Sequence, residues 1–183
     1  LIGNPIDLAD STDVTPVSFG ELEKWMKARK GRCVQYDVET IPAKWWPDRK
    51  LRTMQFGTWQ DQYVIQWSFL DEVQWQQVKG WLENPAWIKV IHNAMFESVI
   101  CRFYKIRLQG IFDTMLAEQV IWGGEQGAVG YGLDDVCYRR MGFGLDKTYQ
   151  TAFSEDVLTP PLVRYAAQDV KDLEMIRGLQ LGE

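Results

Sequence analysis

The sequence predicts an α/β domain in which helices pack on a five-stranded mixed sheet, and two observations support this fold class. Segments typical of strands come first as a run of three, and then as single strands separated by helices. Strands joined by short links indicate an antiparallel meander, whereas strands that alternate with helices indicate parallel pairing. With 183 residues, of which 46% are hydrophobic, the chain can bury one substantial core. We therefore expect an irregular leader over residues 1–16 and a single domain over 17–183.

Capping, periodicity and turn signals give the order of the expected elements. A capping box over Ser18–Glu21 begins a helix that ends near Lys30. Two adjacent prolines are tolerated in the first turn of a long final helix over 159–179. Between these two helices we expect strands at 34–40, 51–59, 63–67, 87–91 and 111–112, and helices at 71–82, 94–104, 114–122 and 133–141.

The composition narrows the classes of partner. Lys and Arg total 20 against 25 Asp and Glu, a net charge of −5, which is unusual for a protein that grips a nucleic-acid backbone unaided.

The three cysteines are widely separated and form no Cys-x-x-Cys pair, so we expect a reducing, intracellular compartment, no disulfide framework and no zinc site. No apolar run is long enough to span a membrane and no secretory signal is evident, so no membrane partner is expected.

Acidic side chains fall at three positions that suggest a site. Asp37 and Glu39 are two residues apart on a predicted strand, so they project from one face, where a stable fold rarely keeps them without a cation. Glu97 is expected in the first turn of a helix that follows a buried strand, a common ligand position in α/β sheets. Tyr165 and Asp169 are four residues apart and share one helix face.

Each position also has a purely structural interpretation. The first pair could form an exposed acidic edge strand, Glu97 could complement its helix dipole, and Tyr165 could be a core residue beside a solvated Asp169. Carboxylate ligands without a His or Cys cluster suit Mg²⁺ or Mn²⁺. Removing the four acids from the charge count leaves −1, so bound cations would neutralise much of the acidity.

Taken together, the three motifs resemble those of a known family. The segments 37–39 (Asp-Val-Glu), 92–97 (His-Asn-Ala-Met-Phe-Glu) and 165–169 (Tyr-Ala-Ala-Gln-Asp) occur in the order of the exonuclease motifs of the DEDD (DnaQ-like) 3′–5′ exonuclease superfamily, in its tyrosine (DEDDy) branch. Supporting matches lie at 112–116, 132–133, 145–147 and 162–170, and the resemblance covers about residues 17–180. The chain looks similar to RNase D, to Werner-type exonucleases and to the proofreading domain of family A DNA polymerases. The second motif departs from the pattern, because it ends in Glu97 where the family has Asp.

The resemblance implies a ribonuclease H-like fold and two bound ions, Mg²⁺ or Mn²⁺, roughly 3.5–4 Å apart. It implies that Asp37 bridges both ions, that Glu39 and Asp169 surround the ion that binds the attacking water, and that Glu97 lies near the other ion through water. Tyr165 would orient the attacking water, since a phenol with a pKa near 10 is a poor base. Asp113 could support the site from behind these ligands.

The resemblance also implies contacts with the substrate. Thr40, Ile41, Asn93 and Phe96 match family positions that contact the 3′-terminal nucleotide. Apolar and aromatic faces bind single-stranded ends with little sequence preference, and two further candidates for stacking, Trp45 and Trp46, follow Lys44 and precede Arg49. His92, the single histidine, is interpreted as structural, because Tyr165 occupies the place of the histidine in the DEDDh branch.

The leading hypothesis is a metal-dependent 3′–5′ exonuclease that hydrolyses the 3′-terminal phosphodiester of single-stranded DNA and releases a nucleoside monophosphate. It would serve as a proofreading domain, and a fused or associated family A DNA polymerase would supply the missing basic grip. We expect an intracellular location, in the cytoplasm or in organellar or viral replication machinery. Two alternatives are a free-standing RNase D- or Werner-like exonuclease acting on RNA or DNA, and an inactive fold that serves as a binding module, suggested by Glu97.

Overall fold

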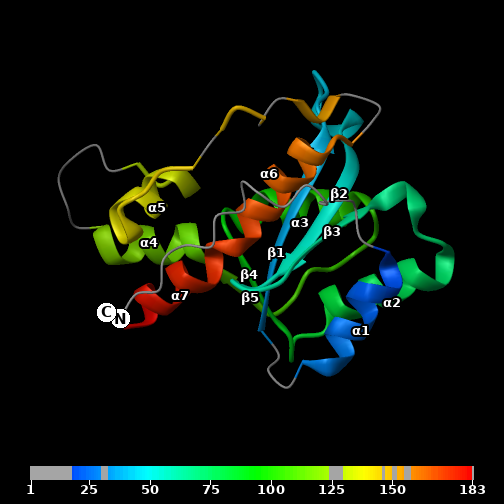
Figure 1. Cartoon of the computed structure of the whole chain (residues 1–183), viewed down its shortest axis with the longest axis horizontal. Coiled ribbons are helices and arrows are strands. Elements are labelled where there is room, and N and C mark those ends of the chain that lie inside the picture. The colour runs from blue at the N-terminus through cyan, green and yellow to red at the C-terminus, as the bar shows by residue number, and fades with distance from the viewer. Residues whose placement is uncertain are drawn as a thin grey trace.

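A five-stranded mixed sheet in the order β3-β2-β1-β4-β5 forms the centre of the computed structural model (Figure 1). The structure describes residues 18–29, 33–123, 130–145, 147–149, 152–154 and 158–182, so the expected leader lies outside it. The strands are β1 (Cys33–Ile41), β2 (Lys50–Gly57), β3 (Gln62–Gln66), β4 (Ile88–Ile91) and β5 (Ile111–Asp113). β1, β2 and β3 are antiparallel neighbours, whereas β4 runs parallel to both β1 and β5. The predicted ribonuclease H-like sheet, a meander plus two parallel strands, is confirmed.

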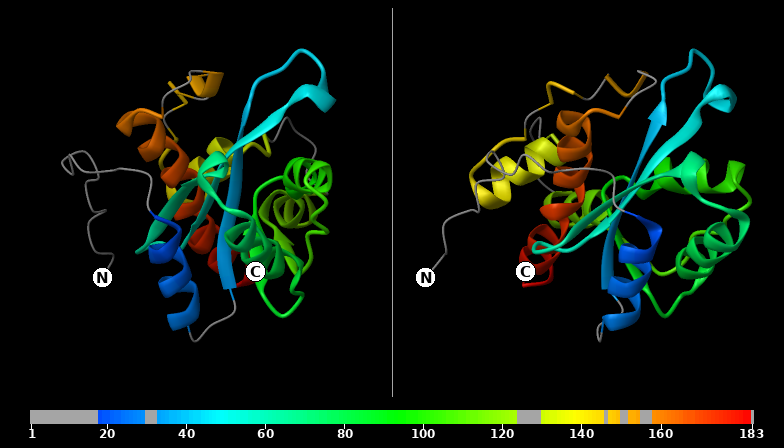
Figure 2. Two further views of the ribbon diagram at one scale, coloured as in Figure 1. Left: turned by 90° about the vertical axis from the view of Figure 1, so that its right-hand side faces the viewer. Right: turned by 45° about the vertical axis from the view of Figure 1, so that its right-hand side comes forward.

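Helices cover both faces of this sheet, as Figure 2 shows. One face carries α1 (Phe19–Ala28), α2 (Glu72–Glu83) and α3 (Ala94–Phe103). The other carries α4 (Thr114–Trp122), α5 (Leu133–Met141), α6 (Pro160–Lys171) and α7 (Leu173–Leu181). Short 3₁₀ helices are η2 (Trp46–Asp48), η3 (Trp67–Phe69) and η4 (Ala152–Ser154).

The alternation of side chains along β1 separates the hydrophobic core from the acids. Val34, Tyr36 and Val38 are almost completely buried and pack with α1, α2 and α3. Asp37 and Glu39 project from the opposite face, because successive residues of a strand point to opposite sides. That face is crossed by α6, which contacts β1, β2 and β3. The strand therefore presents its two carboxylates beneath a helix.

The prediction of one long final helix is wrong, since α6 and α7 meet at Asp172. Asp172 is 1% exposed, and its carboxylate accepts a hydrogen bond from Gln168 Nε2 at 2.6 Å. Its carbonyl oxygen accepts from the amide of Ile176, the first bond of α7. Aspartate favours helix caps over helix interiors, and hydrophobic periodicity does not register such a break.

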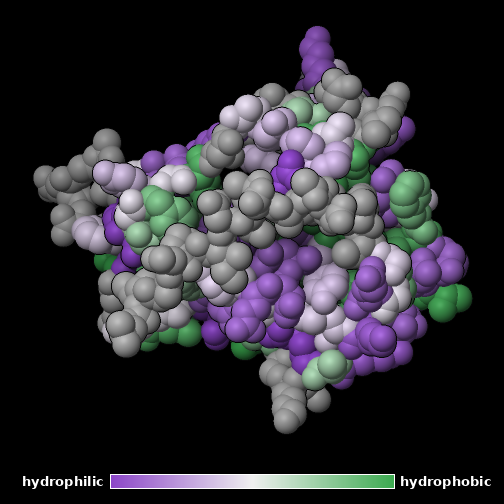
Figure 3. Space-filling model, in the orientation of Figure 1, coloured by the Kyte–Doolittle hydropathy of each residue, from purple (hydrophilic) through white to green (hydrophobic). Residues whose placement is uncertain are grey.

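One face of the molecule shows the distribution of polar and apolar residues at the surface. On the face shown in Figure 3, hydrophilic residues dominate and hydrophobic ones form small, separate patches. Among the described residues, no helix combines the length and the apolar character needed to cross a membrane.

Candidate metal centre and substrate cleft

Three of the predicted acids converge where α6 crosses β1. Carboxylate oxygens of Asp37, Glu39 and Asp169 all lie within 4.8 Å of one another. The fourth, Glu97, lies in the first turn of α3, is 2% exposed, and shares a hydrogen bond with Asp37. The structure thus brings together side chains from one strand and two helices that are distant in sequence.

The electrostatics of this cluster are unfavourable without a cation. Burial raises the pKa of Asp37 to about 7. Burial, followed by the charges of Asp37 and Asp169, raises the pKa of Glu39 to about 10. Burial and then the charge of Asp37 hold the pKa values of Glu97 and Asp169 well above their ordinary values. Without a bound cation, the cluster would therefore retain protons at neutral pH that free carboxylates lose.

The donor set fits a hard divalent cation. All four candidate ligands offer carboxylate oxygens, which Mg²⁺ and Mn²⁺ prefer. The Glu97 Oε2 atom is buried and has no hydrogen-bond partner among the described residues. A cation would give this oxygen a partner and would remove the repulsion among the carboxylates.

Tyr165 lines the same cleft as the acids. The cleft has a volume of about 310 Å³. Tyr165 lies one turn before Asp169 on α6, and its ring centre is 6.0 Å from that of Phe153. The four-residue spacing thus places a phenol beside the carboxylates, as expected for residues on one helix face.

The predicted substrate residues divide into two groups. Asn93 and Phe96 line the cleft, and Asn93 begins α3 in the left-handed backbone region, with φ 64° and ψ 54°. Thr40 is 6% exposed, and neither it nor Ile41 is among the residues that line the cleft. Arg49 links the groups, because its guanidinium lies 5.9 Å from the centre of the Phe96 ring and its Nη1 lies 3.5 Å from Thr40 Oγ1.

The two adjacent tryptophans are only partly described. Trp45 is 66% exposed, as a stacking side chain on a loop would be, whereas the side chain of Trp46 lies outside the description.

Asp113 supports the site through the backbone. Its carboxylate accepts hydrogen bonds from the amides of Asn93 at 3.1 Å and Ala94 at 2.9 Å, which open α3. It also accepts from Met115 and Leu116 at the start of α4. One carboxylate thus caps two helices, including the helix that carries Glu97.

Several cleft residues were not assigned a role from the sequence. They are Val38, Gly132, Leu133, Asp134, Leu145, Lys147 and Leu173, and His92, which was interpreted as structural, also lines the cleft directly after β4. Asp134 organises part of this group, since its carboxylate accepts from the Leu145 amide at 2.6 Å and lies 3.5 Å from Lys147 Nζ. The matches at 132–133 and 145–147 were the available signal, because they mark family segments outside the three acidic motifs.

A ribonuclease H-like sheet whose central strand and neighbouring helices bring four carboxylates together is typical of metal-dependent nucleases. The chain belongs to the 3′–5′ exonuclease family, whose sequence profile matches residues 18–177. This confirms the resemblance to the DEDD exonuclease superfamily.

Individual relatives agree with this assignment. The chain is 31% identical over 122 residues to DNA polymerase I of Aquifex aeolicus (strain VF5), a match that covers 66% of this chain and 20% of that protein. The chain thus spans about a fifth of the length of this polymerase.

Two solved structures share the fold. RNase D of Escherichia coli, an exoribonuclease, superposes with a TM-score of 0.74 at 19% identity, covering 90% of this chain and 42% of that chain. Brucella melitensis NrnC with bound Mg²⁺ superposes with a TM-score of 0.65 at 18% identity, covering 84% of this chain and 73% of that chain.

Proposed function

We propose that this domain is a metal-dependent exonuclease that removes nucleotides from the 3′ end of single-stranded DNA as nucleoside monophosphates. The proposal rests on the carboxylate oxygens of Asp37, Glu39 and Asp169, which lie within 4.8 Å of one another. Glu97 adds a fourth carboxyl group, which shares a hydrogen bond with Asp37. Two divalent ions, Mg²⁺ or Mn²⁺, would be held by these four carboxylates, and the Mg²⁺ in NrnC supports the choice of ion. Bound there, such ions would stabilise the charge that develops on the phosphate oxygens.

The side chains around the cluster have separate tasks in this proposal. Asp37 shares a hydrogen bond with Glu97 and has a ligand atom within 4.8 Å of those of Glu39 and Asp169, which supports a role in which it would contact both cations. Tyr165 orients the attacking water through its hydroxyl group and does not act as the base. Asp113 fixes the start of α3 and therefore the reach of Glu97.

The cleft suits the end of a flexible strand. Phe96 offers an aromatic face for the terminal base, and the Arg49 guanidinium, 5.9 Å from the centre of that ring, adds positive charge beside a site dominated by carboxylates. Stacking of this kind binds single strands with little sequence preference. Thr40 and Ile41 would contribute through the end of β1 next to this platform.

The proposed biological role is proofreading as part of a family A DNA polymerase. The polymerase relative and the net charge of −5 support this proposal, since a polymerase would provide the cationic surface that holds DNA. An intracellular location, in the cytoplasm or in organellar or viral replication machinery, follows from the same role. The likeness to RNase D keeps a free-standing nuclease acting on RNA as the second candidate.

The test is digestion of oligonucleotides of one sequence, prepared as DNA and as RNA, single-stranded and duplex, each labelled at the 5′ end. We expect a ladder of products shortened from the 3′ end on single-stranded DNA with Mg²⁺ or Mn²⁺, and none with EDTA. Preferential digestion of RNA would favour the RNase D-like function. Absence of digestion, together with absence of Mn²⁺ binding in calorimetry, would instead favour an inactive binding module.

Replacing Tyr165 with Phe should slow single-stranded DNA hydrolysis by about 10- to 100-fold, because water orientation is lost while the ring and the metal ligands remain. Single-turnover kinetics would measure the effect, and Mn²⁺ affinity should be unchanged. Replacing Tyr149, also on the α6 side of the molecule, with Phe is the matched control and should leave the rate within about twofold. An unchanged rate in the Tyr165 variant would remove the phenol from the mechanism.

A further inference from the structure

The α5 side of the cleft is formed by residues at the start of that helix. Gly132, Leu133 and Asp134 line the cleft, and Asp134 holds the segment with Leu145 and Lys147. The placement of this wall therefore depends on how the residues just before α5 are held.

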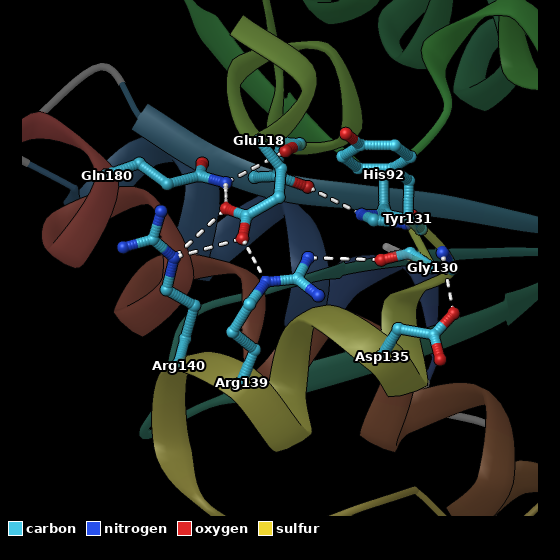
Figure 4. Close-up of polar contacts among 10 residues, drawn as sticks. His92, Glu118, Gly130, Tyr131, Asp135, Arg139, Arg140 and Gln180 are labelled. Atoms are coloured by element: carbon cyan, nitrogen blue, oxygen red, sulfur yellow. Dashed lines mark hydrogen bonds and ion pairs between the residues drawn. The ribbon is translucent and has the colours of Figure 1, made fainter. Parts of the chain in front are cut away.

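Three consecutive residues before α5 are each held by a different side chain (Figure 4). The carbonyl oxygen of Gly130 accepts from Arg139 Nη2 at 3.1 Å. The carbonyl oxygen of Tyr131 lies 2.9 Å from His92 Nε2, and the amide of Gly132 donates to Asp135 Oδ2 at 3.2 Å. Arg139 and Asp135 belong to α5 itself, so His92 supplies the bond that ties the segment to the sheet.

His92 is suited to this task by its tautomer and its place. A carbonyl oxygen can only accept, so Nε2 must carry the hydrogen that bonds Tyr131. Nδ1 lies 2.9 Å from the hydroxyl of Thr114, the first residue of α4. His92 itself follows β4 directly and precedes the turn at Asn93 that opens α3. One ring therefore connects the ends of three elements around the cleft.

A buried ion cluster anchors the other end of the same wall. Glu118 of α4 is 0% exposed and pairs with Arg139 Nε at 2.8 Å and Arg140 Nε at 3.0 Å. Gln180 of α7 donates to Glu118 at 2.9 Å and to the carbonyl oxygen of Thr114 at 2.9 Å. Burial acts to raise the pKa of Glu118, but these donors outweigh it and lower the pKa, so the carboxylate remains charged. Paired buried charges of this kind fix geometry, because displacing either partner leaves the other unpaired.

We propose that His92 and Arg139 are positioning residues that set the α5 wall of the substrate cleft. His92 acts through the carbonyl of Tyr131, and Arg139 acts through the carbonyl of Gly130 while Glu118 holds its guanidinium. This inference rests on the proposed function in one respect, that the cleft receives the 3′ end of a nucleic acid. Asp37, Glu39 and Asp169 lie on β1 and α6, outside the segment that these two residues hold, so we expect the two residues to affect substrate binding more than the chemical step.

The experiment compares His92→Phe, which keeps a planar ring but cannot bond Tyr131, with His92→Gln, whose side-chain amide can donate in place of Nε2. We expect His92→Phe to raise KM for a single-stranded oligonucleotide about 10-fold with kcat within about twofold, and His92→Gln to restore most of the affinity. Mn²⁺ affinity should be unchanged in both. Arg139→Lys should also raise KM, whereas Arg102→Lys, at an exposed position in the last turn of α3, is the matched control and should leave KM within about twofold.

Hydrogen–deuterium exchange provides a readout that does not need catalysis. The backbone amides of 131–136 should exchange faster in His92→Phe than in the wild type, and His92→Gln should return them toward wild-type protection. Unchanged KM and unchanged exchange in His92→Phe would overturn the inference, as would a loss of thermal stability with KM preserved. A wild-type protein without nuclease activity would instead overturn the proposed function, and the exchange comparison would still test the positioning role.

Discussion

Replacement of Asp37 with Asn is expected to lower the rate of 3′-end hydrolysis by at least about 10³-fold, because about 4 kcal/mol of transition-state stabilisation would depend on the cations that we propose Asp37 helps to bind. Asp37 lies close to every other acid of the cluster. It shares a hydrogen bond with Glu97, and its carboxylate lies within 4.8 Å of those of Glu39 and Asp169. The near-isosteric amide keeps the shape of the site and removes the charge. The measurement is single-turnover cleavage of 5′-labelled DNA, with Mn²⁺ affinity followed by calorimetry.

The matched control removes an acid from the opposite side of the sheet. Glu23 lies on α1 and pairs with Lys27 at 2.8 Å, so Glu23→Gln changes the net charge by the same amount and should alter the rate by no more than about twofold. Wild-type cleavage by a purified Asp37→Asn protein, free of contaminating nuclease, would show that this cluster is not the catalytic site.

The metal-free protein is expected to lose stability as the pH rises from 5 to 8. Unfolded carboxyl groups titrate near pH 4, whereas burial raises the folded pKa of Asp37 to about 7 and that of Glu39 to about 10. Between these values the folded state binds more protons than the unfolded state, so the free energy of unfolding falls with increasing pH. If the folded state binds one proton more than the unfolded state over two pH units, the free energy of unfolding falls by about 2.7 kcal/mol. This decrease would lower Tm by at least about 5 °C.

Divalent cations should reverse this trend, since they bind the deprotonated ligands. Calorimetric scans at several pH values, with EDTA or with Mg²⁺, would show a gain from Mg²⁺ that is larger at pH 8 than at pH 5. Burial holds the pKa of Asp169 well above its ordinary value, so this carboxyl group also lowers stability at pH 8; the variant Asp169→Asn removes it and without metal should melt above the wild type at pH 8 and gain less from Mg²⁺. A metal-free Tm that does not vary with pH would contradict the raised pKa values.

The sequence predicted the order of strands and helices along the chain from local patterns, and it predicted that the acids share one site from the resemblance to the DEDD exonucleases. Period-two alternation around Asp37 and Glu39 identifies their common face, and a spacing of four places Tyr165 beside Asp169 on one helix face. Asp113 was expected to support the site, and the two helix caps it provides explain how it could do so.

Other features depend on contacts that local patterns do not encode. The break at Asp172 follows from its burial, and the second strand ends at Gly57 because the Thr58 hydroxyl accepts from two amides and turns the chain before the expected boundary. Likewise, nothing in the sequence around His92 indicates that its ring reaches the Tyr131 carbonyl, since that bond joins residues 39 positions apart.

The carboxylates of the cluster belong to parts of the chain that the ribosome makes at different times. Asp37 and Glu39 are synthesised early, whereas Asp169 arrives with α6, near the end of the described residues. A ribosome-bound fragment that lacks this helix has no complete cation cage and should be unable to cut nucleic acid. The order of synthesis would therefore delay the proposed activity until α6 has been made and has packed on β1.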